Sequence, residues 1–311
     1  MELNMRNYQN EEDYWRIRAF LRRVFLLNNR RELSWPAARL DYYRWHGIMN
    51  IQQGNLEKDI FLWETAGGEI AAVLNNEGPG QVFLQVHPDH RTPVLEEDLL
   101  EVAEEHLTHT RAEGEPYLVV WCHAQDEIRQ AVLKRRDYRL VDKPETEECQ
   151  YSRDLAGPIA EVRVPAGFTV RALGGEDELP PRSWASWRAF HPQDPDEDYE
   201  GWEWYLNIQK APMYRRDLDI VAIAPDGQVA AFTTVWFDDV TRSAYFEPVG
   251  TVPEHQRKGL GKAVMTEGLR RLQERMAVRA AVAGFTPAAK ALYGSVMGKT
   301  YQVCQPWIKK G

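Results

Sequence analysis

The segment VPEHQRKGLGKAV, residues 252–264, decides how the chain is interpreted, because a helix is expected to begin inside it. Gly259 and Gly261 stand immediately before an apolar pattern of helical spacing. The first turn of a helix presents N–H groups without partners in the helix, and glycine, lacking Cβ, lets an anion approach them. The basic residues around the glycines are Arg257, Lys258 and Lys262. The segment is therefore a candidate anion cradle, with an ordinary helix entry and a solvated basic turn as alternatives.

The strand expected before this segment carries residues that interrupt pairing. In AYFEPVGT, residues 244–251, Pro248 has no N–H donor and Gly250 weakens a strand, so a bulge or an edge is expected there. A strand that leaves its neighbour exposes N–H and C=O groups, to which an extended ligand with amide groups can pair. A ligand with a diphosphate at one end and a peptide-like arm fits both features, and coenzyme A has this shape.

The chain contains a hidden repeat. Arg6 and Arg171, each on an expected strand before an amphipathic helix, are 165 positions apart, and so are Pro88 and Pro253 in the two proline turns. The order of expected elements between and after these points is the same in both halves. The boundary is expected in RDLAGPIAEVRVPAG, residues 153–167, which gives domains 1–155 and 165–311.

The composition excludes several classes of function. The chain has 311 residues, a formal net charge of -9 and three cysteines without CxxC spacing. The negative charge argues against nucleic acid as a partner. The sequence contains no run of about 18 apolar residues, so a membrane span is not expected. The cysteine pattern favours a reducing compartment, and the polar N-terminus does not resemble a signal peptide. We therefore expect a cytoplasmic protein with no metal, nucleic-acid or membrane partner; the oligomeric state stays open.

The segment from 252 to 264 resembles the acyl-CoA-binding motif of the GNAT superfamily of N-acetyltransferases, Q/R-x-x-G-x-G/A, at the start of the helix after the bulged strand. TPAAKALYGSVM, residues 286–297, resembles a later motif of that family. The resemblance implies an α/β (α+β) fold of two tandem GNAT units, each a mixed, mostly antiparallel, twisted sheet flanked by helices. In layout the chain is similar to the mycothiol synthases.

The resemblance also implies roles for individual residues. Main-chain groups of the bulged strand would bind the pantetheine arm of acetyl-CoA, here at Val249, Gly250 and Thr251. Loop amides would bind the pyrophosphate, here at Gln256, Arg257, Lys258, Gly259, Leu260, Gly261 and Lys262. Tyr293 would protonate the departing thiolate. The sequence departs from the family pattern at Thr286-Pro287 and Met297-Gly298.

Direct attack by an amine requires a base, because a lysine-like amine with pKa about 10.4 is almost entirely protonated near neutral pH. Glu247, on the bulged strand, is the candidate base, and an exposed carboxylate without a role is the alternative. For Tyr293 the alternative to the acid is a core tyrosine. His191 and His255 are expected to be loop residues without a catalytic role.

The segment FHPQDPDEDYEGWEWYL, residues 190–206, is a candidate wall of the acceptor pocket. Acidic groups beside aromatic faces suit a cationic amine, although a solvated acidic loop leading into a core helix is the alternative. The residues concerned are Asp194, Asp196, Glu197, Asp198, Glu200, Trp202 and Trp204.

The first copy is not expected to bind acetyl-CoA in the same way. At the positions equivalent to the glycine loop it has Pro93, Val94 and Glu96. Pro93 has no N–H donor, Val94 would obstruct the approach of a phosphate, and Glu96 would repel it. Leu133 falls about where the tyrosine would be. We therefore expect a degenerate GNAT domain with a structural or substrate-shaping role.

The function expected is the transfer of an acetyl group from acetyl-CoA to a primary amine of a small molecule, without a metal. A non-catalytic acyl-CoA-binding sensor and a protein-lysine acetyltransferase are the alternatives.

Overall fold

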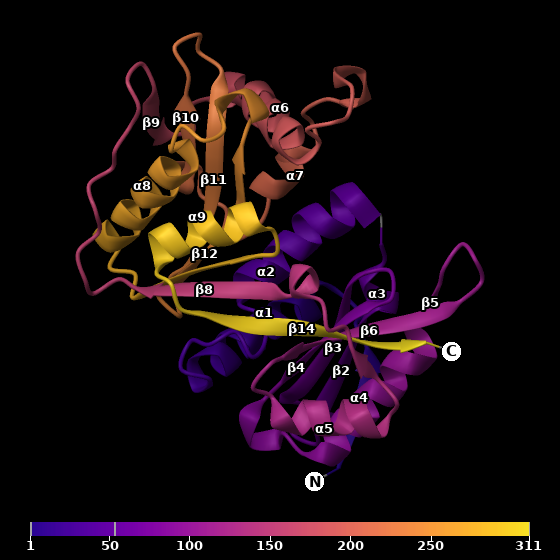
Figure 1. Ribbon diagram of the computed structural model, residues 1–311. Coiled ribbons are helices and arrows are strands. Elements are labelled where there is room, and N and C mark those ends of the chain that lie inside the picture. Colours follow the sequence, from indigo (N-terminus) through magenta and orange to yellow (C-terminus); the bar gives the residue numbers. More distant parts are fainter. Residues whose placement is uncertain (1, 53, 311) are drawn as a thin grey trace.

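The computed structural model describes residues 2–52 and 54–310 and shows two units of the same element order joined by one continuous sheet (Figure 1). The helices of the first unit are α1 (Glu11–Leu27), α2 (Ala37–Tyr42), the π-helix η1 (Tyr43–Gln52), α3 (Leu56–Asp59), η2 (Pro88–His90), α4 (Pro93–His106), α5 (Glu127–Arg135) and η3 (Pro144–Thr146). Its strands are β1 (Leu3–Asn7), β2 (Ile60–Thr65), β3 (Ile70–Gly78), β4 (Gln81–Val86), β5 (His109–Thr110), β6 (Pro116–His123), β7 (Arg139–Leu140) and β8 (Glu148–Asp154).

The second unit repeats this order. Its helices are η4 (Glu176–Glu178), α6 (Leu179–Phe190), η5 (Asp196–Asp198), α7 (Tyr205–Gln209), η6 (Arg216–Leu218), η7 (Pro253–His255), α8 (Leu260–Glu274) and α9 (Pro287–Met297). Its strands are β9 (Thr169–Ala172), β10 (Asp219–Ile223), β11 (Val229–Asp238), β12 (Ser243–Thr251), β13 (Arg279–Gly284) and β14 (Tyr301–Lys310). Within residues 2–52 and 54–310, no helix has the length and apolar character needed to cross a bilayer.

Equivalent side chains make the same contacts in the two units. Arg6 on β1 donates to both carboxylate oxygens of Asp13 at 2.7 and 2.6 Å. Arg171 on β9 does the same with Glu178 at 2.8 and 2.6 Å. Each partner lies 165 positions from its counterpart, so the structure confirms the repeat found in the sequence.

The last strands of the two units are exchanged. β14, at the end of the chain, lies between β6 and β8 and pairs antiparallel with both. β8, at the end of the first unit, pairs with β13 of the second. Neither unit therefore completes its sheet from its own segment, and both strands cross the middle of the molecule in Figure 1. The full path is β1-β2-β3-β4-β6-β14-β8-β13-β12-β11-β10-β9.

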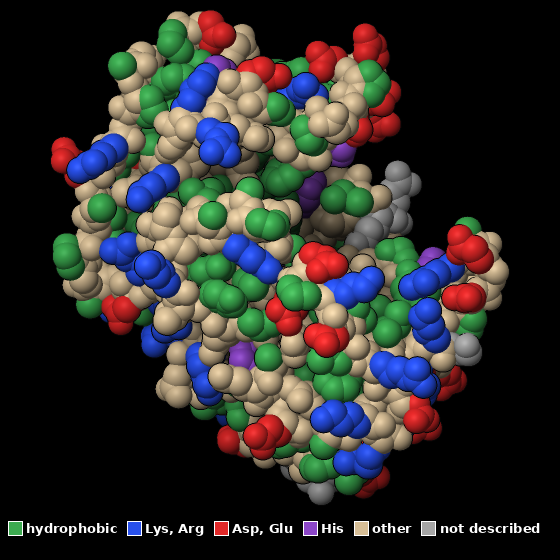
Figure 2. Space-filling view, in the orientation of Figure 1, with side chains coloured by type: hydrophobic (Ala, Val, Ile, Leu, Met, Phe, Trp, Pro, Cys, Tyr) green, Lys and Arg blue, Asp and Glu red, His purple; other side chains and the backbone are tan. Residues whose placement is uncertain are grey.

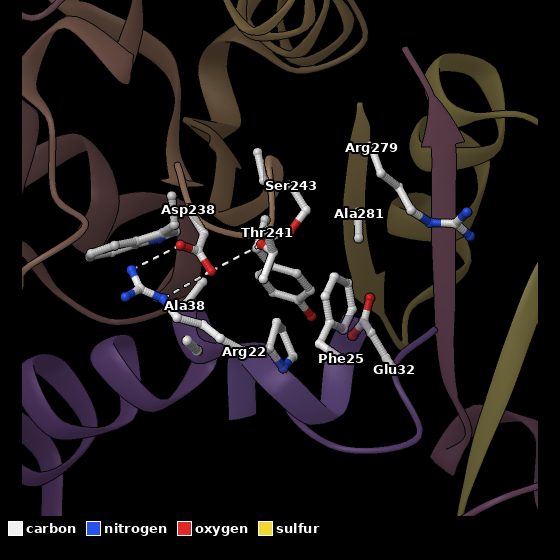
Figure 3. Close-up of a pocket in the computed structure, with 14 residues that line it drawn as sticks. Arg22, Phe25, Glu32, Ala38, Asp238, Thr241, Ser243, Arg279 and Ala281 are labelled. Atoms are coloured by element: carbon white, nitrogen blue, oxygen red, sulfur yellow. Dashed lines mark hydrogen bonds and ion pairs between the residues drawn. The ribbon is translucent and has the colours of Figure 1, made fainter. Parts of the chain in front are cut away.

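Side chains also join the units where α1 and α2 meet β11 and β12. One apolar cluster contains buried residues of both halves, among them Tyr14, Leu40 and Trp236. At the edge of this cluster Arg22 on α1 forms an ion pair with Asp238 on β11 at 2.8 Å, and the same carboxylate accepts a hydrogen bond from Thr241 (Figure 3). The first unit is therefore fixed against the strands that carry the candidate site.

Candidate active site

Strand β12 is interrupted at Glu247 and Pro248, where the sequence predicted a bulge. Its pairing with β11 shifts register there, and its parallel pairing with β13 extends only from Ser243 to Tyr245. The indole Nε1 of Trp236 donates to the Glu247 carbonyl oxygen at 2.5 Å, so a side chain satisfies the backbone carbonyl at the bulge. Beyond Tyr245 the two strands separate, and a gap opens in the ladder.

The backbone of β12 beyond the bulge faces this gap. The N–H of Val252 donates to the Ala230 carbonyl oxygen on β11 at 3.0 Å. Because N–H and C=O groups alternate along a strand, those of Val249 and Thr251 point away from β11, toward the side where β13 no longer pairs. Gly250 lies opposite Phe232, whose ring would come within 2.3 Å of a Cβ at this position. The strand therefore presents amide groups that an extended ligand can pair with, and position 250 requires glycine.

Helix α8 begins beside this strand without a side-chain cap. Gly259 is its N-cap residue, with φ +82°, and the first intrahelical bond runs from the N–H of Ala263 to the Gly259 carbonyl oxygen. The preceding amides in the helix, at residues 260–262, are therefore left for an external acceptor. Arg257 also has positive φ. Where residues of positive and negative φ follow one another, successive N–H groups turn toward one point and form a concave site suited to anions.

The loop residues are held close to β12. The side-chain amide of Gln256 donates to the Thr251 carbonyl oxygen at 3.3 Å. A Cβ at Gly261 would lie 3.4 Å from the Thr251 hydroxyl and 3.1 Å from Leu292 on α9. Of the basic residues, Arg257, Lys258 and Lys262 are all exposed. The structure therefore brings the amides, the open strand and positive charge together.

A cavity of about 730 Å³ lies between the two units (Figure 2). Of the predicted catalytic and cofactor-binding residues, Glu247, Val249 and Tyr293 line it. Figure 2 shows the hollow between the upper and lower halves, with histidine side chains at its mouth. The remaining predicted residues, Gly250, Thr251 and residues 256–262, are not in its lining; they form the adjoining strand and loop described above.

Tyr293 reaches the cavity from α9. This helix begins at Pro287 after the N-cap Thr286, whose hydroxyl accepts from the Ala289 N–H at 3.2 Å. The ring packs against Gly284, where a Cβ would come within 2.7 Å of it. Burial, together with the nearby Glu247, raises the pKa of Tyr293 above its usual value. The phenol therefore stays protonated and can serve as a proton donor.

Glu247 faces the cavity from the bulge and is poorly solvated. This raises the pKa of its carboxyl to about 8, an effect that Arg39 opposes and that Glu77 and Glu148 reinforce. Arg39 on α2 is shared by the other two carboxylates, at 2.6 Å from Glu77 and 3.0 Å from Glu148. Because that cation is already engaged, Glu247 can exchange a proton near neutral pH.

The π-helix η1 of the first unit forms the opposite wall, which the sequence did not predict. Asn50 donates to the Trp204 carbonyl oxygen at 3.2 Å and accepts from Asn207 at 2.8 Å, so η1 is tied to α7. The rings of His46 and Trp204 lie 5.4 Å apart, and burial lowers the pKa of His46 to about 4. Tyr42, at the end of α2, lines the same wall. The spacing of these residues is that of an ordinary buried helix, so no sequence signal marks them.

The acidic segment contributes only part of what the sequence suggested. Asp198, Glu200 and Trp204 line the cavity. The other members of the segment named above, Asp194, Asp196, Glu197 and Trp202, do not line it. His191 lines the cavity as well, whereas His255 belongs to the turn η7.

The equivalent loop of the first unit is closed by its own side chains. Helix α4 is capped by Thr92, whose hydroxyl accepts from the Leu95 N–H at 3.2 Å. Glu96 is completely buried and paired with Arg91 at 2.8 Å and Arg129 at 2.9 Å. The carboxylate is thus an internal counterion rather than an exposed repulsive charge.

In the part of the chain that the structure describes, no group of three or more His, Cys, Asp or Glu side chains could hold a metal ion.

Comparisons with known proteins agree with this geometry. Residues 180–298 match the model of the Acetyltransferase (GNAT) family. A search of curated proteins gave no match. Similar solved structures include a GCN5-related N-acetyltransferase from Sphaerobacter thermophilus, with TM-score 0.65 and 18% identity over 99% of this chain and 95% of that one.

Two further structures have the same fold over the whole chain. A tandem GNAT protein from the clavulanic acid biosynthesis pathway has TM-score 0.60 and 16% identity, covering 99% of this chain and 98% of that one. A GNAT-family acetyltransferase from Colwellia psychrerythraea has TM-score 0.58 and 12% identity, covering 98% and 100%. The chain therefore has the tandem GNAT fold, and residues 180–298 in its second half match the GNAT acetyltransferase family.

Proposed function

We propose that this tandem GNAT acetyltransferase transfers an acetyl group from acetyl-CoA to a primary amine of a small molecule by direct attack. The observation that carries the proposal is that Glu247 and Tyr293 line one cavity at the point where β12 parts from β13. The cavity adjoins an uncapped helix start, so a donor, an acceptor, a base and an acid can meet there.

Acetyl-CoA would lie along the open side of β12. Its pantetheine amides would pair with main-chain groups of Val249 and Thr251, while Gly250 between them keeps the strand against β11. Its pyrophosphate would accept from the first amides of α8. The loop residues assigned to the pyrophosphate are Gln256, Arg257, Lys258, Gly259, Leu260, Gly261 and Lys262. Support comes from the exposed basic side chains and from Gly261, which leaves room beside Thr251.

In the chemical step the ionised Glu247 carboxylate accepts a proton from the bound ammonium group. The neutral nitrogen attacks the thioester carbonyl, the C–N bond forms and the C–S bond breaks. A main-chain N–H near Val249 stabilises the negative charge on the carbonyl oxygen. Tyr293 gives its phenolic proton to the leaving thiolate, and the nitrogen, cationic after the attack, loses its second proton to solvent. Glu247 then releases its proton to solvent, and Tyr293 takes one up.

The two halves would divide the work. Residues 165–311 bind acetyl-CoA, and residues 1–155 form a degenerate domain that shapes the acceptor pocket. The buried Glu96 and the wall formed by η1 support this division. A cavity bounded by both units favours a small molecule over a lysine on a protein surface. The three free cysteines agree with a location in the cytoplasm.

The test is release of free thiol from acetyl-CoA in the presence of a panel of small amines and of lysine-containing proteins. We expect turnover with small amines that depends on Tyr293 and Glu247. Acetyl-CoA binding without turnover on any amine or protein would instead indicate a sensor, and turnover confined to proteins would indicate a protein-lysine acetyltransferase.

A further inference from the structure

We infer that the acceptor is an amine with an apolar, ring-sized body and no carboxylate or phosphate group. This inference rests on the proposed function and names its substrate class. The charges in the cavity carry the first step. Its lining includes the carboxyl groups of Asp198, Glu200 and Glu247, and no lysine or arginine among the described residues.

Two arginines close to the cavity, Arg39 and Arg188, are already engaged. Arg39 is buried between Glu77 and Glu148. Arg188 donates to the carbonyl oxygens of His191 and Pro192, at 3.3 and 3.2 Å. His46 adds no positive charge near neutral pH, because burial lowers its pKa to about 4. An anionic group on the substrate would therefore be desolvated beside carboxylates and without a lysine or arginine counterion, which is strongly unfavourable.

Aromatic rings form much of the remaining wall. They come from both units and from the acidic segment, and those used here are Tyr42, Trp187, Tyr199, Trp204 and Phe285. Several are held in place: the Tyr199 hydroxyl donates to Ser183 at 2.8 Å, and the ring of Trp187 stacks on that of His191 at 5.4 Å. Aromatic faces attract ammonium groups and bury apolar groups, so both parts of such an amine are accommodated.

The volume agrees with a small acceptor. About 730 Å³ falls within the range of about 300–1,000 Å³ typical of small-molecule sites, and part of it must hold the acyl end of the donor. Asp198 and Glu200 are exposed, so they lie where an incoming ammonium group meets solvent before it reaches Glu247.

Matched pairs of acceptors test the inference on the full-length protein. Phenethylamine is compared with phenylalanine, and tryptamine with tryptophan, since each pair differs by one carboxylate. We expect kcat/KM for thiol release to be at least about 100-fold higher for the amine of each pair, because a buried unpaired group is rejected strongly. Equal or higher values for the amino acids would overturn the inference.

Variants of the two exposed cavity carboxylates test whether these side chains attract the amine. Asp198→Asn and Glu200→Gln should each raise KM for phenethylamine severalfold while kcat changes less than about twofold, as expected for lost ground-state attraction. Glu197→Gln, in the same exposed turn but outside the lining, is the matched control. An unchanged KM in both cavity variants would contradict a role of these carboxylates in amine selection.

A binding measurement separates failure of this inference from failure of the proposed function. Phenethylamine and phenylalanine are titrated calorimetrically into protein saturated with CoA, where no transfer can occur. Binding of the amine alone supports the inference even if no acceptor is turned over, an outcome that would refute catalysis. Preferential binding of phenylalanine refutes the inference, whatever the turnover.

Discussion

Glu96 and Gly261 occupy equivalent positions in the two units, 165 residues apart, and they give the two helix starts opposite properties. The Glu96 carboxylate is buried against Arg91 and Arg129. At Gly261 no side chain is present, and the adjoining amides have no partner in the helix. One loop therefore carries its own anion, and the other can accept one from a ligand.

Acetyl-CoA should consequently bind with a stoichiometry of one per chain. Calorimetric titration should show a single site that Gly261→Glu abolishes, because the new carboxylate would face the diphosphate and its Cβ would crowd Leu292. Gln228→Glu, which adds the same charge in an exposed hairpin turn, should bind normally. Two equivalent sites in the wild-type protein would refute the division of labour between the units.

Tyr293→Phe should slow turnover and leave acetyl-CoA binding nearly unchanged. The ring contacts with Gly284 and Tyr151 remain, so only the proton donor is lost. General acid catalysis contributes about 10²- to 10⁴-fold, which sets the expected fall in kcat. Tyr301→Phe, at a half-exposed tyrosine on β14, serves as the control. A kcat within twofold of wild type would remove Tyr293 from the chemical step.

The pH dependence of kcat/KM should be bell-shaped. The active form has Glu247 ionised and the amine protonated, so the rate should rise with pH through an apparent pKa of about 8. It should fall again above the pKa of the amine, about 10. Glu247→Gln should lose the limb near 8 along with most of its activity, whereas Glu161→Gln in the exposed linker should keep both. A limb that persists in Glu247→Gln would assign the base to another group.

The raised pKa of Glu247 predicts that its ionised carboxylate destabilises the fold. A carboxyl whose folded pKa exceeds its ordinary 4.5 stabilises the fold in its protonated form, and that contribution is lost as the pH rises toward about 8. Glu247→Gln should therefore gain in Tm relative to wild type between pH 5 and 8, by about 2–4 °C per kcal/mol, and level off above. A constant difference in Tm across this range would show that Glu247 has an ordinary pKa.

The features that the sequence predicted are local ones. Two glycines beside basic residues mark the start of α8 and Pro248 marks the bulge, because each depends on backbone chemistry within a few positions. Arg6 and Arg171 reveal the repeat because each lies in the same short strand-and-helix pattern, 165 positions apart. The wall from η1 could not be predicted, since His46 and Asn50 have the spacing of any buried helix. The neighbours of each strand in the sheet could not be predicted either, because YQVCQPWIKK, residues 301–310, has the same alternation of side chains whichever strands it pairs with.

The exchange of β8 and β14 predicts that the two units unfold together. Trp307 on β14 belongs to the second unit in sequence, yet its side chain is buried in the core of the first, against residues such as Val120 and Leu133. We expect a single calorimetric transition for the full chain. Trp307→Ala should lower its Tm as one transition, with a loss of about 3–5 kcal/mol in the free energy of unfolding.

Trp15→Ala is the matched control, because Trp15 is 47% exposed on α1 and its removal should change the Tm little. Acetyl-CoA should raise the Tm of the whole transition, since a ligand bound to the second unit stabilises everything that unfolds with it. Two separate transitions, one shifted by acetyl-CoA and the other by Trp307→Ala, would show that the units unfold independently. In that case β14 would stabilise the first unit without coupling it to the acetyl-CoA site of the second.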